Sequence, residues 1–193
     1  IQVFSLARLR GITPPQTFSA DTRYTGVSNT HTLTIDEEAG LLYAVGTNTC
    51  GGGPHILDIR TPTAPTFAGC YETEGYTHEA QCLTYDGPDT EHVGKPICFL
   101  YQGLGAQTSG GQVVIVDMTD PSAPQSIGSG FYPNPGYSHQ GWLTPDRTRI
   151  LINDEFDPAI PGTRTIVMNV ADLDNPDFEF NYFSDPQTYA HNI

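Results

Sequence analysis

A pattern recurs four times in this chain of 193 residues, and each copy ends on a histidine. Each copy begins with an apolar, β-branched run, continues through a proline-containing turn and a second extended stretch, and closes with a short tail into His. Repeats of about 40 to 50 residues, each holding four short strands, are typical of β-propellers. The pattern therefore predicts an all-β chain, a β-propeller of four-stranded antiparallel blades. The histidines are His31, His78, His139 and His191, at spacings of 47, 61 and 52 residues.

The apolar runs that open the repeats predict the third strand of each blade. They are nearly continuous rather than alternating, as expected for strands that are buried on both faces between neighbouring sheets. Proline-containing turns follow the runs, and proline both fixes φ for a turn and stops a strand from continuing. The runs are residues 2–6, 55–59, 113–117 and 166–170.

We expect about three complete blades, with partial blades at both ends. The unfinished ring indicates a segment of a longer chain, or an assembly in which other chains complete or extend the propeller. The 61-residue unit carries its extra length in two stretches, residues 86–95 and 102–111, which we expect to be loops. The complete blades are residues 31–77, 78–138 and 139–188, with half a blade in 1–30 and the start of another in 189–193.

Composition and charge exclude some classes of partner. Glycine and proline number 20 and 16, which favours turns and short strands over helices. The formal net charge of −14 repels nucleic-acid phosphates and anionic membranes, so we expect no nucleic-acid partner. No stretch approaches the length of a transmembrane helix, so we expect no direct membrane insertion by this segment. The acidic surface leaves carboxylates free for divalent cations, or serves solubility alone.

The four cysteines, Cys50, Cys70, Cys82 and Cys98, contain no Cys-x-x-Cys pair and fit no zinc pattern. Cys50 follows the second strand of one expected blade, and Cys70 lies in the fourth strand of the same blade. Cys82 and Cys98 lie on adjacent strands of the next blade. Strand adjacency favours the disulfides Cys50–Cys70 and Cys82–Cys98 among the three possible pairings. An even cysteine count without metal spacing favours an oxidising compartment, and so a secreted or cell-surface protein.

Several segments resemble a known family. The run Val114-Ile115-Val116-Asp117 resembles the LVIVD repeat, and the cysteine- and histidine-bearing segments are similar to the choice-of-anchor B family. The resemblance covers essentially the whole chain and implies a secreted or surface-anchored β-propeller, often within a longer chain. It implies no particular reaction. The chain departs from the strict repeat at Ser5 and Asn169, where the other two runs have Asp58 and Asp117. The similar segments are residues 48–53, 67–70, 75–82 and 137–143.

The four repeat histidines are the first candidate site. Each stands where the innermost strand of a blade begins, and innermost strands line the central channel, so these side chains can converge near the axis. Imidazoles on a ring are suitable ligands for zinc, copper or another transition metal. The alternative is structural: a histidine at this place hydrogen-bonds a neighbouring turn, with the aspartate of the third strand holding its tautomer. The candidates are His31, His78, His139 and His191.

Acidic loops are the second candidate. Asp154, Glu155 and Asp157 lie together between the second and third strands of the last full blade, and oxygen-rich loops suit calcium. Neither this group nor the looser one in the inserted loop has the spaced Asp-x-Asp-x-Asp-Gly pattern, so solvated loops are the alternative. The expected cofactor is therefore a divalent metal, calcium or zinc. The looser group is Asp86, Asp89 and Glu91.

The remaining chemistry-bearing residues indicate no catalytic constellation. Gly-x-Ser-x-Gly is absent, and the glycine runs 51–53 and 110–111 have no P-loop lysine. We interpret His55 and His92 as incidental and expect Trp142 to pack in the core.

Taken together, these features favour an extracellular binding or structural module with an unidentified protein or glycan ligand, rather than an enzyme. The first alternative is a metal-dependent hydrolase or lyase at the channel mouth, with histidine ligands and Asp154 or Glu155. The second alternative is a subunit of a surface layer or filament, joined through open blade edges.

Overall fold

The computed structural model describes residues 1–103, 112–157, 162–185 and 191–192. These residues form an all-β structure with four antiparallel sheets, three of four strands and one of two strands. Helix is limited to two short 3-10 turns, Leu6–Leu9 and Cys50–Gly52. A search of the described residues for a helix long and apolar enough to cross a membrane finds none.

Each four-stranded sheet takes its strands in chain order, so every strand pairs with the strand that follows it. The segments predicted to hold four strands, residues 31–77, 78–138 and 139–188, each contain one of these sheets. The first sheet has β3 (Thr32–Asp36), β4 (Leu41–Val45), β5 (His55–Asp58) and β6 (Thr66–Cys70). The second has β7 (Glu79–Thr84), β8 (Pro96–Tyr101), β9 (Gln112–Asp117) and β10 (Gln125–Phe131). The third has β11 (Ser138–Leu143), β12 (Arg149–Asp154), β13 (Thr163–Asn169) and β14 (Asp177–Ser184).

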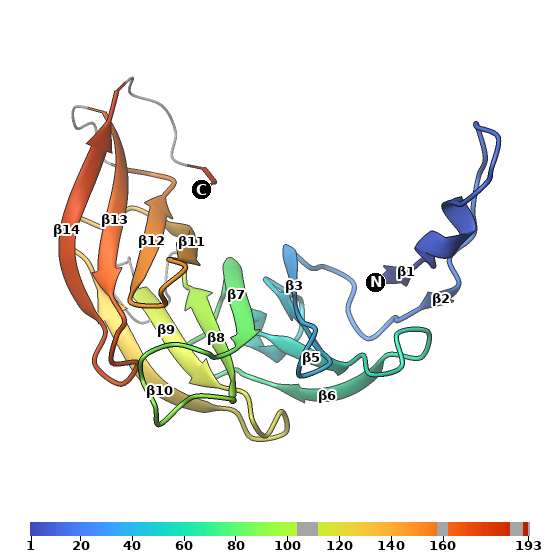
Figure 1. Cartoon of the computed structure of the whole chain (residues 1–193), viewed down its shortest axis with the longest axis horizontal. Helices are drawn as coiled ribbons and strands as arrows, with labels where there is room; N and C mark the ends of the chain where they lie inside the picture. The colour runs from blue at the N-terminus through green and yellow to red at the C-terminus, as the bar shows by residue number, and fades with distance from the viewer. Residues whose placement is uncertain (104–111, 158–161, 186–190, 193) are drawn as a thin grey trace.

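The three sheets stand side by side in an arc (Figure 1). Their first strands, β3, β7 and β11, lie on the inner side of the arc and contact one another, whereas β6, β10 and β14 lie on the outer side. Within the described ranges the arc is open and forms no closed ring. This arrangement brings the starts of the first strands together, although they are far apart in the sequence.

Apolar side chains fill the two spaces between neighbouring sheets. Tyr43 and Ile56 of the first sheet pack with Leu100 and Val114 of the second. The other face of the second sheet packs on the third through a larger cluster that includes Phe99. The central strand β9 is buried on both faces, which explains its uninterrupted Val-Val-Ile-Val sequence.

The fourth strand of each sheet has a β-bulge: two successive residues of the third strand pair with fourth-strand residues that are two positions apart. The bulge lies at the same register position in all three sheets. In the first two sheets a glycine follows the bulge, Gly69 opposite Ile56 and Gly128 opposite Ile115. A Cβ on Gly69 would lie 1.7 Å from the carbonyl oxygen of Pro121, and one on Gly128 would lie 2.1 Å from that of Leu173. The turn after the third strand of one sheet therefore packs directly on the backbone of the preceding sheet.

The N-terminal run forms less strand than predicted. The strand extends only over β1 (Gln2–Val3), which pairs with β2 (Thr22–Arg23), and the chain then enters the 3-10 turn Leu6–Leu9. The physical reason is local: Asp21 accepts hydrogen bonds from the Ser5 amide and the Arg8 guanidinium, which folds the chain back.

The structure contains both expected disulfides, Cys50–Cys70 and Cys82–Cys98. Cys82 and Cys98 are directly opposite each other on β7 and β8, within the core between the first two sheets. The two disulfides are consistent with secretion.

The expectation that Trp142 packs in the core is wrong, because its side chain is 56% exposed. Its neighbour Leu143 faces the core instead. Trp142 lies on the face of the third sheet that points away from the second sheet, here called the outer face. It stands there in a row with Leu151, Val167 and Phe180, across all four strands. No further sheet covers this face among the described residues.

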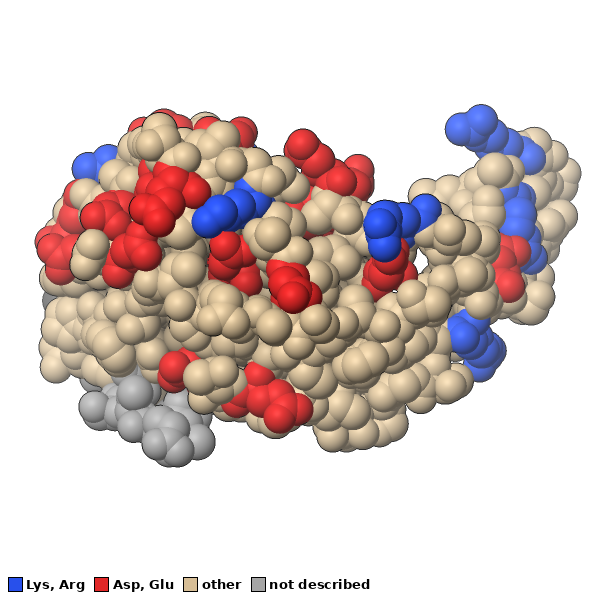
Figure 2. Space-filling model, turned by 90° about the horizontal axis from the view of Figure 1, so that it is seen from below, with Lys and Arg blue, Asp and Glu red and all other residues tan. Residues whose placement is uncertain are grey.

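Acidic side chains are distributed over the face of the sheets seen in Figure 2, with few basic side chains between them. This distribution follows from 22 acidic against 8 basic residues in the chain. A chain with this excess of negative charge attracts cations.

Candidate metal centre

The four repeat histidines come together on the inner side of the arc. His31 and His78 directly precede β3 and β7, His139 is the second residue of β11, and His191 follows the third sheet. The ring centroids are 3.8 Å apart for His31 and His78, 4.5 Å for His78 and His139, and 4.3 Å for His139 and His191. These four side chains, here called the histidine row, form a continuous stack.

The two central members of the row are the buried ones. The exposed fraction of His78 is 7% and that of His139 is 2%, whereas His31 and His191 are exposed. In the part of the chain that the structure describes, Nε2 of His78 and Nδ1 of His139 are buried without a hydrogen-bond partner. Buried polar atoms are normally satisfied, so these two nitrogens are candidate ligand atoms.

Tyrosine hydroxyls occupy the other side of His78. The hydroxyl of Tyr137 lies 2.8 Å from His78 Nδ1, and that of Tyr76 lies 3.2 Å from the same atom. When Nδ1–H donates to a tyrosine oxygen, Nε2 carries the lone pair that a metal ion needs. The tyrosines therefore orient His78 as a ligand through its free nitrogen.

Glu155 completes a set of three possible ligands. Its carboxylate lies 3.9 Å from Nε2 of His139, and one ligand atom each from His78, His139 and Glu155 lies within 4.8 Å of the others. The residues come from two sheets, since His78 precedes the second sheet while β11 and the end of β12 belong to the third. Two imidazoles and one carboxylate form a donor set that suits zinc and leaves one position open for water.

Burial keeps the central histidines neutral. Burial, together with the neighbouring imidazoles of His31, His139 and His191, lowers the pKa of His78 to about 4. Burial and His191 also lower the pKa of His139, although Glu155 acts in the opposite direction. Neutral imidazole is the form that binds metal, so the lowered pKa values of His78 and His139 favour the form of both side chains that can act as a ligand.

The aspartates of the third strands are not the partners of these histidines. Asp58 pairs with Arg60, and Asp117 pairs with Lys95 and the Thr119 amide. Asp58 lies at the end of β5, opposite Leu41, and Asp117 lies at the end of β9, opposite Ile97. Both ends are away from the histidine row. At His78, two tyrosine hydroxyls stand beside Nδ1, the place that the sequence prediction gave to an aspartate.

The proposed calcium ligands Asp154, Glu155 and Asp157 do not act together. Asp154 is fully buried and accepts hydrogen bonds from the Tyr132 hydroxyl and from the Gly136, Tyr137 and Phe156 amides. Asp157 pairs with the buried guanidinium of Arg164, which also lies 3.5 Å from Asp154. The calcium prediction is corrected accordingly: two of the carboxylates hold the fold together, and only Glu155 faces the histidine row.

The looser acidic group is also dispersed. Asp86 pairs with Arg147, and Asp89 accepts a hydrogen bond from the Leu173 amide. His92, which we had interpreted as incidental, is buried and lies 3.1 Å from Asp174, so it links the inserted loop to the third sheet.

A metal ion is unfavourable at His92, although Asp89, His92 and Asp174 lie close together. The Lys95 ammonium lies 3.4 Å from Nδ1 of His92, where its positive charge opposes a bound cation, and Asp174 lies 3.1 Å from Nε2. We therefore interpret this group as a contact between two sheets.

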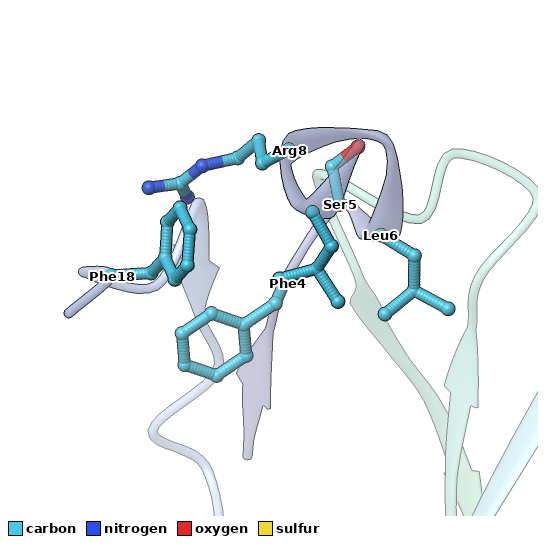
Figure 3. A pocket seen from close by; sticks show the side chains of 6 residues that line it. Phe4, Ser5, Leu6, Arg8 and Phe18 are labelled. Atoms are coloured by element: carbon cyan, nitrogen blue, oxygen red, sulfur yellow. The ribbon is translucent and has the colours of Figure 1, made fainter. Parts of the chain in front are cut away.

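A separate apolar hollow of about 400 Å³ lies on the N-terminal segment (Figure 3). Phe4, Leu6, Leu9 and Phe18 line it, with the Arg8 guanidinium 4.9 Å from the Phe18 ring centroid. Arg8, the charged member of this lining, is paired with Asp21. The hollow offers no group for chemistry comparable to the histidine row.

Comparison with known proteins adds no identification. Neither a scan against models of known protein families nor a search of curated proteins finds a match for this chain.

The sequence contains a signal for the tyrosines that contact His78, because they recur at a fixed position in the repeat. A tyrosine stands two residues before the histidine in three of the four tails, including Tyr76 before His78 and Tyr137 before His139. The sequence left the choice between Asp154 and Glu155 open, because the approach of a carboxylate to His139 depends on how the loop after β12 turns back.

Proposed function

We propose that this chain is a β-propeller segment that acts as an extracellular metal-binding module, with its metal centre at His78, His139 and Glu155. The observation that carries the proposal is that ligand atoms of two buried imidazoles and one carboxylate lie within 4.8 Å of one another, with Nε2 of His78 unpartnered among the described residues. The donor set favours zinc over calcium, since calcium prefers oxygen ligands alone.

Three features support the propeller part of the proposal. The sheets repeat with the same strand order, bulge position and inner first strand, and the LVIVD-like runs occupy the third strands. The stacking of His191 on His139 repeats the stacking of His139 on His78. A propeller places such first-strand residues around its central channel, where a bound metal would face a ligand entering from one end.

Equilibrium dialysis against Zn²⁺, followed by elemental analysis, tests the metal centre. We expect one Zn²⁺ bound per chain, lost in H78Q and H139Q and weakened at least about tenfold in E155Q. H92Q is the matched control, because it removes a buried histidine outside the row and should leave zinc binding unchanged. Absence of zinc above the buffer level, or equal binding in all four variants, would overturn the proposal.

The three-ligand set also favours a second candidate, a zinc-dependent hydrolase. Two histidines and a glutamate with an open fourth position are the ligand pattern of catalytic zinc sites, where bound water acts as the nucleophile. Zinc-loaded protein should then hydrolyse an activated ester faster than the metal-free protein, and H139Q should abolish the difference. Equal rates with and without zinc would exclude this candidate for that substrate class and leave the binding module.

A further inference from the structure

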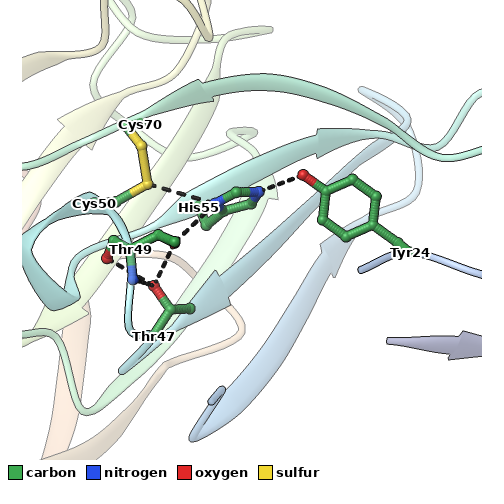
Figure 4. The surroundings of a disulfide bond; sticks show 6 residues. All are labelled: Tyr24, Thr47, Thr49, Cys50, His55 and Cys70. Atoms are coloured by element: carbon green, nitrogen blue, oxygen red, sulfur yellow. Dashed lines mark hydrogen bonds between the residues drawn. A yellow bond between two sulfur atoms is a disulfide. The ribbon is translucent and has the colours of Figure 1, made fainter. Parts of the chain in front are cut away.

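The two disulfides have different surroundings. Cys82 and Cys98 lie on paired strands and are enclosed by apolar side chains, including Leu100 and Val114. Cys50, in contrast, lies in the 3-10 turn Cys50–Gly52 and is joined to Cys70 at the end of β6. A buried histidine, His55, stands beside the Cys50–Cys70 pair (Figure 4).

Polar contacts hold His55 in a fixed orientation. Its Nδ1 lies 3.6 Å from Sγ of Cys50 and 2.9 Å from the Thr49 hydroxyl, and the Tyr24 hydroxyl lies 2.7 Å from Nε2 (Figure 4). The exposed fraction of His55 is 4%. Ligand atoms of Cys50, His55 and Cys70 all lie within 4.8 Å of one another.

We propose that Cys50, Cys70 and His55 form a redox-controlled zinc site, closed as a disulfide when oxidised and able to bind Zn²⁺ when reduced. Two sulfur ligands and one imidazole are a known donor set for zinc, with water in the fourth position. The Tyr24 hydroxyl would then accept the Nε2–H of His55, as the outer partners of ligating histidines do. This site is separate from the histidine row and does not depend on it.

The chemistry requires a reductant from outside the protein, namely a dithiol. Its first thiolate attacks one sulfur of the disulfide, and its second thiol resolves the mixed disulfide. The S–S bond accepts two electrons, each cysteine sulfur takes up a proton, and the dithiol becomes a cyclic disulfide. Zn²⁺ then displaces the two thiol protons and forms two Zn–S bonds and one Zn–N bond.

The turn that carries Cys50 allows the sulfurs to separate. Gly51 and Gly52 adopt φ values of 59° and 89°, which glycine tolerates at little cost, and no strand pairing holds Cys50 itself. Cys82 and Cys98 lack this freedom, because both belong to paired strands. Zinc binding on reduction is therefore expected at Cys50 and Cys70 and not at Cys82 and Cys98.

Cobalt titration of the reduced protein tests the proposal. Thiolate ligation to Co²⁺ gives a near-ultraviolet charge-transfer band that histidine and carboxylate ligands do not give. The protein is reduced with excess dithiothreitol, and the dithiothreitol is then removed by dialysis. We expect the band in this reduced protein and no band in the oxidised protein. Addition of Zn²⁺ should displace Co²⁺ and abolish the band. The Co²⁺ band should persist in C82S/C98S and in H78Q/H139Q, be lost in C50S/C70S, and weaken at least about tenfold in H55Q.

The test remains decisive if reduction loosens the fold. Circular dichroism of reduced H78Q/H139Q, which lacks the histidine row, with and without Zn²⁺ then gives the result: recovery of the β-sheet signal supports the site, and no recovery contradicts it. For a reduced chain that stays folded, no charge-transfer band, or a band of equal strength in H55Q, would overturn the proposal. Because H78Q/H139Q removes the histidine row, failure of this site is distinguishable from failure of the metal centre.

Discussion

Asp154 and Glu155 are adjacent in the sequence but have opposite surroundings. Asp154 lies inside the third sheet with its oxygens occupied by backbone amides and the Tyr132 hydroxyl, whereas the Glu155 side chain is partly exposed beside His139. The first residue therefore serves the fold and the second serves the site.

This division predicts different effects of two neighbouring substitutions. D154A should lower the free energy of unfolding by about 3 kcal/mol or more, because it leaves the Tyr132 hydroxyl and the Gly136 and Tyr137 amides without their acceptor and removes a carboxylate beside Arg164. E155Q should change it by no more than about 0.5 kcal/mol, while weakening zinc binding. Urea denaturation of both variants measures the difference, and comparable stability of D154A and wild type would contradict the assignment.

The histidine row predicts a pH dependence of stability. Burial and neighbouring imidazoles lower the pKa of His78 to about 4, against about 6.5 for an ordinary histidine. Between these two values the unfolded chain binds a proton that the folded chain does not. The free energy of unfolding should therefore fall as the pH decreases from about 6.5 to about 4, and this contribution should level off below.

Metal-free wild type and H78Q, denatured with urea at several pH values across this window, isolate the effect. Carboxylates contribute to both proteins, so the histidine contribution is the difference between the two slopes. H78Q should show the shallower decline. Identical slopes would mean that His78 has no lowered pKa in the folded chain.

The residues of the row could be predicted from the sequence because a repeat puts equivalent side chains at equivalent places. The choice of Glu155 over Asp154 could not, since a loop conformation decides which of three nearby carboxylates turns toward His139. The same holds for His55 and His92, which contact partners 31 and 82 residues away, Tyr24 and Asp174.

At the scale of the elements, glycine controls how neighbouring sheets approach. Gly128 follows the bulge of β10, where the turn containing Leu173 packs against its backbone. The equivalent position in the third sheet is Phe180, opposite Val167, whose side chain is exposed on the outer face. A glycine is therefore needed only where a following sheet packs in the described structure.

G128A should lower the free energy of unfolding by about 1 to 3 kcal/mol, because its Cβ would overlap the Leu173 carbonyl. S129A, the exposed next residue on β10, is the matched control and should change stability by less than about 0.5 kcal/mol. Thermal or chemical denaturation gives both values. Equal stability of G128A and wild type would show that the contact between the sheets is looser than described.

Strand order and the buried third strands follow from sequence patterns, because turns and apolar runs are local signals. The 3-10 turn at Leu6–Leu9 and the exposure of Trp142 do not. The turn depends on the hydrogen bonds that Asp21 accepts from Ser5 and Arg8. The exposure of Trp142 depends on whether another sheet covers its face, and the amino-acid pattern of a strand is similar in either case.

At the scale of the whole molecule, the metal centre joins two sheets. His78 belongs to the start of the second sheet, and His139 and Glu155 belong to the third. An ion bound to all three residues would connect the sheets at the inner side of the arc, in addition to the apolar cluster between them. Zinc should therefore stabilise the fold as a whole.

Zinc at about 100 times its dissociation constant should raise the free energy of unfolding by about 2.7 kcal/mol. For a chain of this size the melting temperature should increase by about 5 to 10 °C. Calorimetry with and without Zn²⁺ measures the shift, and a chelator should reverse it. Calcium in place of zinc should produce no comparable shift, and an equal shift in H139Q would place the stabilising ion elsewhere.

Anomalous X-ray scattering at the zinc absorption edge, on crystals of the zinc-loaded oxidised protein, tests the metal centre most directly. The account predicts an anomalous peak at about 2.0 to 2.2 Å from a ring nitrogen of His78, a ring nitrogen of His139 and a carboxylate oxygen of Glu155. A crystal with zinc in solution and no peak among these three residues, or with its strongest peak on other ligands, would contradict it.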